Sequence, residues 1–331
     1  QIINISGNST TDRSSYTSLK GIEYFTNLTG LNCSYGNFET LDLSKNTKLS
    51  TLNAIGNKLS TLNISGCTQL YSVSIQGNKL TTLDFTHCSG LGIVDCDDNL
   101  LTSLKVNGLT NLSELYCYAN KLESLDLSGN TGLEVLWCFN NQLSDLNLND
   151  NTALRALRCQ GNQLSNLNLS SNANLTEVVA NSQKLGTLPL YYDSTSEKYI
   201  HTANGTSSAR TFNSNSIIYS NSGLTVELAG FDIENNQLTV TADKTGTGTA
   251  YYSSTLVDGK SWVLSGSFTY ALPGYIEVNE ATALANTNGL LSYLGIAQGS
   301  ATCADFAKIK AGTPGRYEVA VTSGDISYAT E

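Results

Sequence analysis

Several residue types that support catalysis or metal binding are scarce in this 331-residue chain. It has no methionine, three prolines, two tryptophans and two histidines, and charged residues make up 14% of it. The histidines, His87 and His201, leave little material for histidine-based catalysis or for metal sites, so we expect neither a metal nor a cofactor. No run of about 18 apolar residues occurs, which predicts no direct insertion into a membrane. The net charge of −10 disfavours nucleic acid as a partner, because the field of the whole molecule repels phosphate.

What the chain does contain is enough for a folded core. Hydrophobic residues make up 40% of the sequence, which excludes wholesale disorder. A length of 331 residues suggests about two domains. The chain begins Gln1-Ile2-Ile3 without a basic segment, so we expect a mature form from which a signal peptide has been removed.

A repeat of 21 residues is the main organising feature. An apolar position recurs from Leu31 to Val178 through eight copies without an insertion, and a small or apolar residue follows it two positions later. An asparagine then comes three positions further on in most copies, followed by two leucines. The unit is L-x-x-L-x-C-x-x-N-x-L-x-x-L-x-L-S-x-N-x-x. This pattern predicts a mainly β, leucine-rich-repeat solenoid with a parallel concave sheet.

The spacing within one repeat predicts its local structure. Leu31 and Cys33 alternate with polar neighbours, which is typical of a short strand with one face in the core. The asparagine after the strand is expected to satisfy backbone groups where the chain turns. The remaining segment is too short for a helix, so we expect extended or 3₁₀ stretches on the convex side. Because each repeat needs a neighbour, the ends need caps, and Leu19, Ile22 and Phe25 are predicted to cover the first rung.

The chain has eight cysteines, which could form disulfides, but the spacing of most of them disfavours this. Five share the inward position of the repeat, where parallel rungs about 4.8 Å apart exceed the Cβ separation of about 3.8 Å that a disulfide needs. These five are predicted to be buried and reduced: Cys33, Cys96, Cys117, Cys138 and Cys159. Cys67 and Cys88 replace the second asparagine on adjacent rungs, and a bridge between them stays open. Cys303 is predicted to lie in a core.

The repeat resembles that of a known group of surface proteins. A 21-residue unit with a cysteine at the second inward position, followed by L-x-L-S-x-N, is similar to the cysteine-ladder repeats of internalin J. The resemblance covers about residues 19–190 and implies a secreted or cell-surface bacterial protein. Gly36 in place of the first asparagine, Ala54 and Ile75 in the cysteine ladder, and Leu109 at the second asparagine depart from the pattern.

Beyond the solenoid the composition shifts to Ser, Thr, Asn and Tyr. Four segments with alternating apolar residues are predicted strands of a β-sandwich or of an antiparallel sheet docked on the solenoid end: 224–228, 237–240, 250–252 and 267–270. Further on, the stretch Gly312 to Val321 resembles a hairpin of bacterial Ig-like modules, and residues 281–294 match the short helix of such modules. The predicted parts are an N-terminal cap at 1–27, a solenoid at 28–192, a β-rich module at 193–273 and an Ig-like module at 274–331.

The outward strand positions carry the candidate binding residues. Reading them every 21 residues places Tyr116, Tyr118, Trp137 and Phe139 as a two-by-two aromatic patch on adjacent rungs. Contiguous exposed aromatic rings, with an arginine beside them, are typical of protein interfaces. The residues that border the patch are Asp95, Asp97 and Asp98 on one side and Arg158 on the other.

Other interpretations of these residues stay open. Cross-strand stacking that stabilises neighbouring rungs would also place rings together. The three aspartates could be a calcium site, but neighbours on one strand offer few converging oxygens, so a solvated rim is favoured. No motif of a nucleophile, a phosphate loop or a zinc protease occurs, and His87 beside Cys88 lies at a packed repeat turn.

The sequence therefore favours a non-catalytic, adhesin-like surface protein that binds a protein partner on its concave face. Carbohydrate binding is an alternative, because exposed aromatic rings also stack on sugars. A purely structural spacer or cell-wall component is a second alternative.

Overall fold

In the computed structural model, the regular secondary structure of the described residues is almost all β-strand. The structure describes residues 1–6, 17–193, 196, 198–201, 210–241, 244, 246–257, 259–272, 300–302, 319–323 and 326–330. Within these ranges one short 3₁₀ helix, η1 (Ile22–Tyr24), accompanies strands β1 to β23. None of the helical structure in the described residues has the length and hydropathy to cross a membrane.

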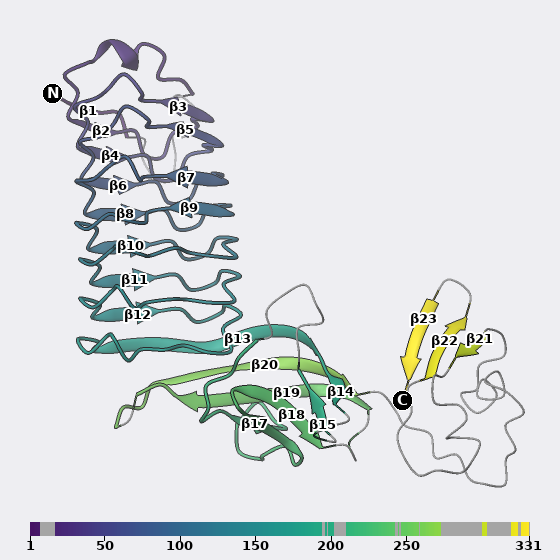
Figure 1. The fold of residues 1–331 in the computed structure, drawn as a ribbon. Helices are drawn as coiled ribbons and strands as arrows, with labels where there is room; N and C mark the ends of the chain where they lie inside the picture. Colours follow the sequence, from purple (N-terminus) through teal and green to yellow (C-terminus); the bar gives the residue numbers. More distant parts are fainter. Residues whose placement is uncertain are drawn as a thin grey trace, which may run out of the picture.

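The 21-residue repeats stack into a column whose rungs pair as parallel strands (Figure 1). Each pairing joins a residue to the one 21 positions later, as in Leu31 with Leu52 and Leu115 with Leu136. The first strand of the sheet precedes the repeats and pairs with the first rung. In spatial order the strands are β1 (Ile2–Asn4), β2 (Gly30–Asn32), β4 (Thr51–Asn53), β6 (Ser72–Ser74), β8 (Ile93–Asp95), β10 (Glu114–Tyr116), β11 (Val135–Trp137), β12 (Ala156–Arg158) and β13 (Glu177–Pro189).

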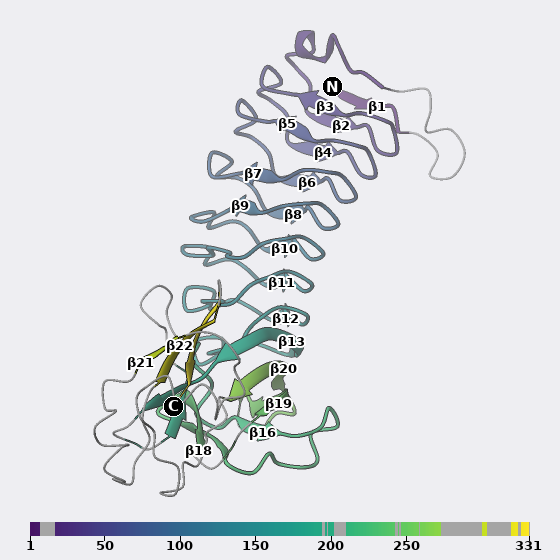
Figure 2. The ribbon, with the colours of Figure 1, turned by 90° about the vertical axis from the view of Figure 1, so that its right-hand side faces the viewer.

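On the opposite side of the column the first four repeats are extended, which is one of the two conformations expected there. Two short parallel pairs run along it, visible beside the main sheet in Figure 2. They are β3 (Thr40–Asp42) with β5 (Thr61–Asn63), and β7 (Thr82–Asp84) with β9 (Ser103–Lys105). Among the described residues, 3₁₀ structure occurs only in the N-terminal segment.

The cysteines of the ladder lie in the core as predicted. All five are fully buried and free. Cys67 and Cys88 are also free, which answers the question of a bridge between them. The thiol of Cys67 donates to the backbone oxygen of Leu43 at 3.2 Å, and that of Cys88 to Cys67 at 3.4 Å. Cys303 lies outside the described residues.

The N-terminal end is covered differently from the expectation. Ile22 is buried and Leu19 packs against the core, but Phe25 is 40% exposed, so its predicted place over the first rung is wrong. Instead the backbone oxygens of Ile22 and Phe25 accept hydrogen bonds from the Asn46 amide, which holds this segment by its backbone. Strand β1 is the edge strand of the sheet and covers the first rung by pairing with β2.

The solenoid sheet continues into the following residues. The long strand β13 pairs in parallel with β20 (Val263–Leu272), which pairs antiparallel with β19 (Gly246–Thr255) and through it with β16 (Ile217–Tyr219). Gly266 makes this possible, because a Cβ there would lie 2.4 Å from the backbone oxygen of Gln183. A separate four-stranded sheet has the order β14 (Tyr191–Asp193), β15 (Lys198–Ile200), β18 (Gln237–Thr241) and β17 (Phe231–Glu234).

Three of the four strands predicted in this region lie within β18, β19 and β20. The fourth, 224–228, is wrong. The side-chain oxygen of Asn221 accepts hydrogen bonds from the backbone N–H groups of Thr225 and Val226, and Leu224 has a φ of 54°. This side chain holds the start of the segment in a turn. Glu227 further on pairs with Tyr219 as an isolated antiparallel bridge, so the segment pairs in part but does not form a continuous strand.

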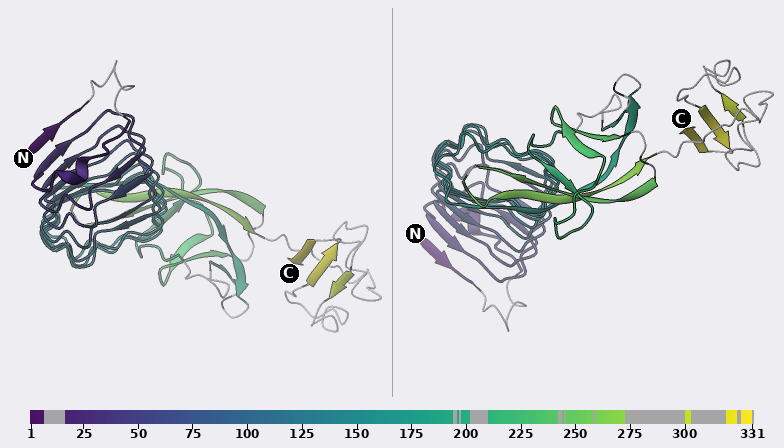
Figure 3. Two further views of the ribbon diagram at one scale, coloured as in Figure 1. Left: turned by 90° about the horizontal axis from the view of Figure 1, so that it is seen from above. Right: turned by 90° about the horizontal axis from the view of Figure 1, so that it is seen from below.

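The described residues between 210 and 272 contact the last repeats through polar groups, and their aromatic rings pack against one another. The Tyr252 hydroxyl donates to the backbone oxygen of Leu164, and the Arg210 guanidinium donates to the side chain of Gln163 at 3.0 Å. The Phe212 ring meets Tyr252 edge-on with centroids 5.4 Å apart. Seen along the column, the rungs superimpose and the green strands extend beyond their outline (Figure 3).

The C-terminal strands β21 (Ser300–Thr302), β22 (Val319–Ser323) and β23 (Ile326–Thr330) form a three-stranded antiparallel sheet. The predicted helix at 281–294 and most of the Gly312 stretch lie outside the described residues. These strands alone do not establish an Ig-like sandwich.

Candidate interaction surface on the parallel sheet

A ladder of asparagines fixes the rungs that present the outward side chains. Asn141 donates from Nδ2 to the backbone oxygens of Cys117 at 3.0 Å and Cys138 at 3.1 Å. Its Oδ1 accepts from the backbone N–H of Leu122 at 3.0 Å. One buried amide therefore satisfies three backbone groups and ties two rungs together, as the sequence predicted for the turn. The same arrangement recurs at Asn57, Asn78, Asn99, Asn120, Asn162 and Gln183.

The structure brings the four predicted aromatic rings together on β10 and β11 and just beyond their ends. Tyr116 pairs with Trp137 in the sheet register, and their rings meet edge-to-face with centroids 5.1 Å apart. Tyr118 stacks on Phe139 at 4.2 Å with the planes 8° apart, and Trp137 lies 6.3 Å from Tyr118. We call these four residues the aromatic platform.

The platform is half-buried, because its rings cover one another. All four residues have intermediate exposure, whereas the inward residues between them, Leu136 and Cys138, are fully buried. In the stacked pair, Tyr118 and Phe139 each cover one face of the other ring. The indole N–H of Trp137 is buried with no acceptor among the described residues, which costs about 1–3 kcal/mol.

Arg158 lies against the platform and is already paired. Its guanidinium carbon is 4.4 Å from the centre of the Trp137 ring, a cation–π contact. Its Nε donates to Glu177 on the next rung at 2.6 Å. Arg158 lies beside the rings, where the sequence analysis expected it, but that analysis missed its ion-pair partner Glu177.

The three aspartates beside the platform are not all solvated, contrary to what the sequence analysis favoured. Asp97 is buried at 7% exposure, Asp95 is half-buried and Asp98 is exposed. Burial, a hydrogen bond to Asp97 and the charge of Asp97 raise the pKa of Asp95 to about 8. Burial and a hydrogen bond to Asp97 also raise the pKa of the Tyr118 hydroxyl. Burial and the neighbouring Asp97 therefore favour the protonated form of the Asp95 carboxyl.

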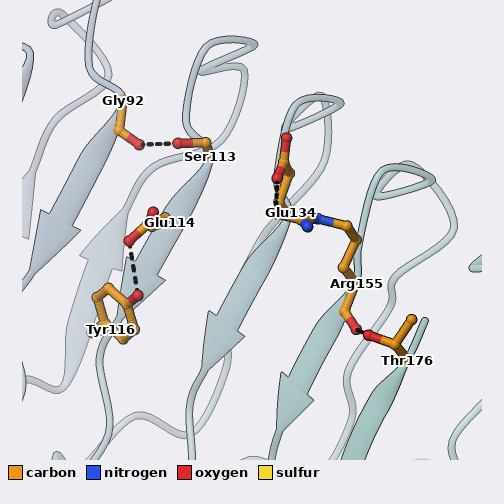
Figure 4. A network of polar contacts seen from close by, with 7 residues as sticks. All are labelled: Gly92, Ser113, Glu114, Tyr116, Glu134, Arg155 and Thr176. Atoms are coloured by element: carbon orange, nitrogen blue, oxygen red, sulfur yellow. Dashed lines mark hydrogen bonds and ion pairs between the residues drawn. The ribbon is translucent and has the colours of Figure 1, made fainter. Parts of the chain in front are cut away.

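A further polar network lies beside the rings (Figure 4). The Tyr116 hydroxyl donates to Glu114 at 2.8 Å, and burial together with this bond raises the pKa of Tyr116 to about 12. Glu134 and Arg155 form an ion pair across neighbouring rungs. The sequence analysis missed these residues. The strand alternation could have found Glu114, which shares a face with Tyr116 two positions later.

The histidine and cysteine that are adjacent in the sequence, His87 and Cys88, both form hydrogen bonds to backbone oxygens. A ring nitrogen of His87 lies 2.9 Å from the backbone oxygen of Ile64, and the Cys88 thiol bonds to Cys67, so these two side chains do not form a catalytic pair. Among the described residues no three His, Cys, Asp or Glu side chains gather closely enough to hold a metal ion.

The repeat length, the parallel rungs and the inward leucines define the fold class. The chain is a leucine-rich-repeat solenoid. No family model matches it, and no curated protein matches it. Proteins of this class generally act as interaction modules, because stacked repeats create an extended binding surface.

Solved structures similar to this solenoid include bacterial leucine-rich-repeat proteins. A leucine-rich-repeat protein of Leptospira interrogans is 25% identical, with 50% of this chain and 46% of that one covered and a TM-score of 0.46. The internalin InlF of Listeria monocytogenes is 23% identical, with 56% and 60% covered and a TM-score of 0.41. The chain thus spans about half the length of these two proteins. The functional domain of InlJ from Listeria monocytogenes, described as including a cysteine ladder, is 19% identical, with 78% and 89% covered and a TM-score of 0.25. These likenesses concern the fold.

Proposed function

We propose that the chain is a non-catalytic protein-binding module whose partner docks over the aromatic platform. The observation that carries this proposal is the contact of four half-exposed rings on the outward face of two adjacent rungs. Tyrosine, tryptophan and arginine concentrate binding energy in interfaces. Asp95, Asp97 and Arg158 are the proposed polar rim, and Asp98 extends it into solvent.

The geometry favours a protein over a sugar at this surface. A sugar ring stacks on an exposed aromatic face, but Tyr118 and Phe139 cover one face of each other. Arg158, which its ion pair with Glu177 holds in place, lies over Trp137. Partly covered rings with charged groups beside them suit the mixed side chains of a protein partner. Because the asparagine ladder holds the rungs, docking costs little ordering entropy.

The buried indole N–H of Trp137 supports binding over a purely stabilising role. Cross-strand stacking alone would be served by phenylalanine, which carries no polar group to bury. The likeness to internalin repeats supports a secreted or cell-surface location, which completes the proposal of an adhesin-like protein.

The test is capture of a partner from host-cell and bacterial extracts by immobilised chain. The double variant Trp137→Ala with Tyr118→Ala should lose capture, whereas Tyr71→Ala should retain it, because Tyr71 is 57% exposed and lies outside the platform. Far-ultraviolet circular dichroism checks that both variants keep their sheet. Equal capture by all three proteins would remove the proposal, and self-association that depends on Trp137 would favour a structural component instead.

A further inference from the structure

A groove of about 600 Å³ lies where the last repeats meet the following residues. One wall is the segment from Asn166 to Leu175, which occupies the repeat positions on the side of β3 and β5 and the turn that follows. The other wall comes from Phe212 to Ser214, Asn236 and the segment that includes Trp262. The groove therefore lies away from the outward face of β10 and β11.

Uncharged polar groups dominate what this groove offers a ligand. Its leucines at 167, 169 and 175 and its phenylalanine are buried, whereas Asn168, Ser170, Ser214 and Asn236 are exposed. Apolar surface comes from the half-exposed Trp262, Leu256 and Val257. Among the lining residues that the structure describes, Lys260 is the one that carries a charge.

The walls are held in place by hydrogen bonds within the chain. The Asn213 amide accepts from the backbone N–H of Leu167 at 3.0 Å and donates to its oxygen at 3.3 Å, which links the two walls directly. The Asn168 oxygen accepts from the backbone N–H of Ser170 at 3.0 Å, and its amide N–H₂ group has no acceptor among the described residues, so it can donate to a ligand. A groove held this way needs little reorganisation on binding.

We propose that this groove binds an uncharged saccharide. A sugar ring has an apolar face that fits an indole and hydroxyl groups that fit amides and serines, which are the two kinds of surface present here. The Lys260 ammonium lies 5.1 Å from the centre of the Trp262 ring on an exposed, flexible side chain. A stacking sugar displaces this ammonium, which then donates to a hydroxyl at the ring edge. The groove is separate from the aromatic platform, so this proposal can be tested independently of the proposed partner docking.

The two tryptophans of the chain make the test specific. In the Trp137→Phe variant, Trp262 is the sole indole and reports on the groove. We would titrate this variant with neutral hexasaccharides of glucose, xylose and N-acetylglucosamine in their common linkages. At least one is expected to shift the Trp262 emission to shorter wavelengths in a saturable way.

Calorimetry with that saccharide then locates the site. Trp262→Ala is expected to weaken binding at least tenfold and Asn168→Ala several-fold, while Trp137→Phe binds like the unaltered chain. Thermal unfolding checks that the Trp262→Ala variant is folded. If it is not folded, the Asn168→Ala variant is used to locate the binding site. The proposal is overturned if no saccharide gives a saturable shift, if both groove variants bind unchanged, or if short peptides shift Trp262 where saccharides do not.

Discussion

The side-chain oxygen of Asn141 accepts a hydrogen bond from the backbone N–H of Leu122, 19 residues earlier, at 3.0 Å. The second asparagine of the same repeat has no such acceptor role. Asn151 donates to the backbone oxygens of Leu127 and Asn130, but its own buried oxygen has no partner among the described residues. The two asparagine columns are therefore chemically different, although both are buried.

This difference predicts unequal effects of the same substitution. Asn151→Cys should cost little, because Cys67 already occupies the equivalent position and its thiol donates in the same direction. Asn141→Cys should cost about 1–3 kcal/mol more, because it leaves the Leu122 N–H buried without an acceptor. Urea denaturation of the two variants measures the difference. Equal midpoints would show that the ladder oxygen contributes nothing.

The Asp95 carboxyl predicts how stability depends on pH. Its pKa is raised to about 8 in the folded chain, against an ordinary value near 3.9. The folded chain therefore holds a proton that the unfolded chain has lost, so this group's contribution falls as pH rises from about 4 to about 8. Asp95→Asn keeps a donor toward Asp97 and does not ionise. We expect it to raise the melting temperature at pH 9 but not at pH 3.

Asp98→Asn is the matched control for this pH effect, because it removes an exposed carboxyl from the same border. The difference between Asp95→Asn and the unaltered chain should change between pH 4 and pH 8. If Asp98→Asn gave the same profile, general charge repulsion would explain the result and the carboxyl pair would not.

The ladder thiols should be unreactive until the solenoid unfolds. Burial raises the pKa of Cys33 and Cys138 to about 12, and it raises those of Cys117 and Cys159 well above their ordinary value. Thiolate is the reactive form, so a thiol reagent at pH 8 should find almost none. In a Cys303→Ser chain, seven thiols should react, but only after denaturant is added. Rapid native reaction of several thiols would contradict the buried ladder.

Much of the solenoid could be predicted because eight successive repeats carry the same local pattern. The period of 21 gave the sheet register, the inward cysteines and the neighbouring positions of the platform rings. Phe25 lies at the end of the column, where no further repeat constrains it, and its predicted burial was wrong. The segment 224–228 was also mispredicted, because one side chain, that of Asn221, outweighs its alternating pattern.

The charges and ion pairs around the aromatic platform could not be predicted from the 21-residue repeat, because they depend on side chains that differ from one repeat to the next. Glu177 pairs with Arg158 from the next rung. The raised pKa of Asp95 results first from its own burial and then from its neighbour Asp97. The continuation of the sheet into β20 requires a strand about 80 residues later in the chain to meet β13, with Gly266 at the point of contact. Such long-range pairings have no local sequence signal.

The most direct test of the docking surface is the accessibility of Trp137 in the presence of a captured partner. In a Trp262→Phe chain, Trp137 is the sole indole, so its fluorescence reports on the platform alone. The account predicts that a bound partner lowers the acrylamide quenching constant several-fold and shifts the emission to shorter wavelengths. A partner that binds while Trp137 stays as quenchable as in the free chain would contradict it.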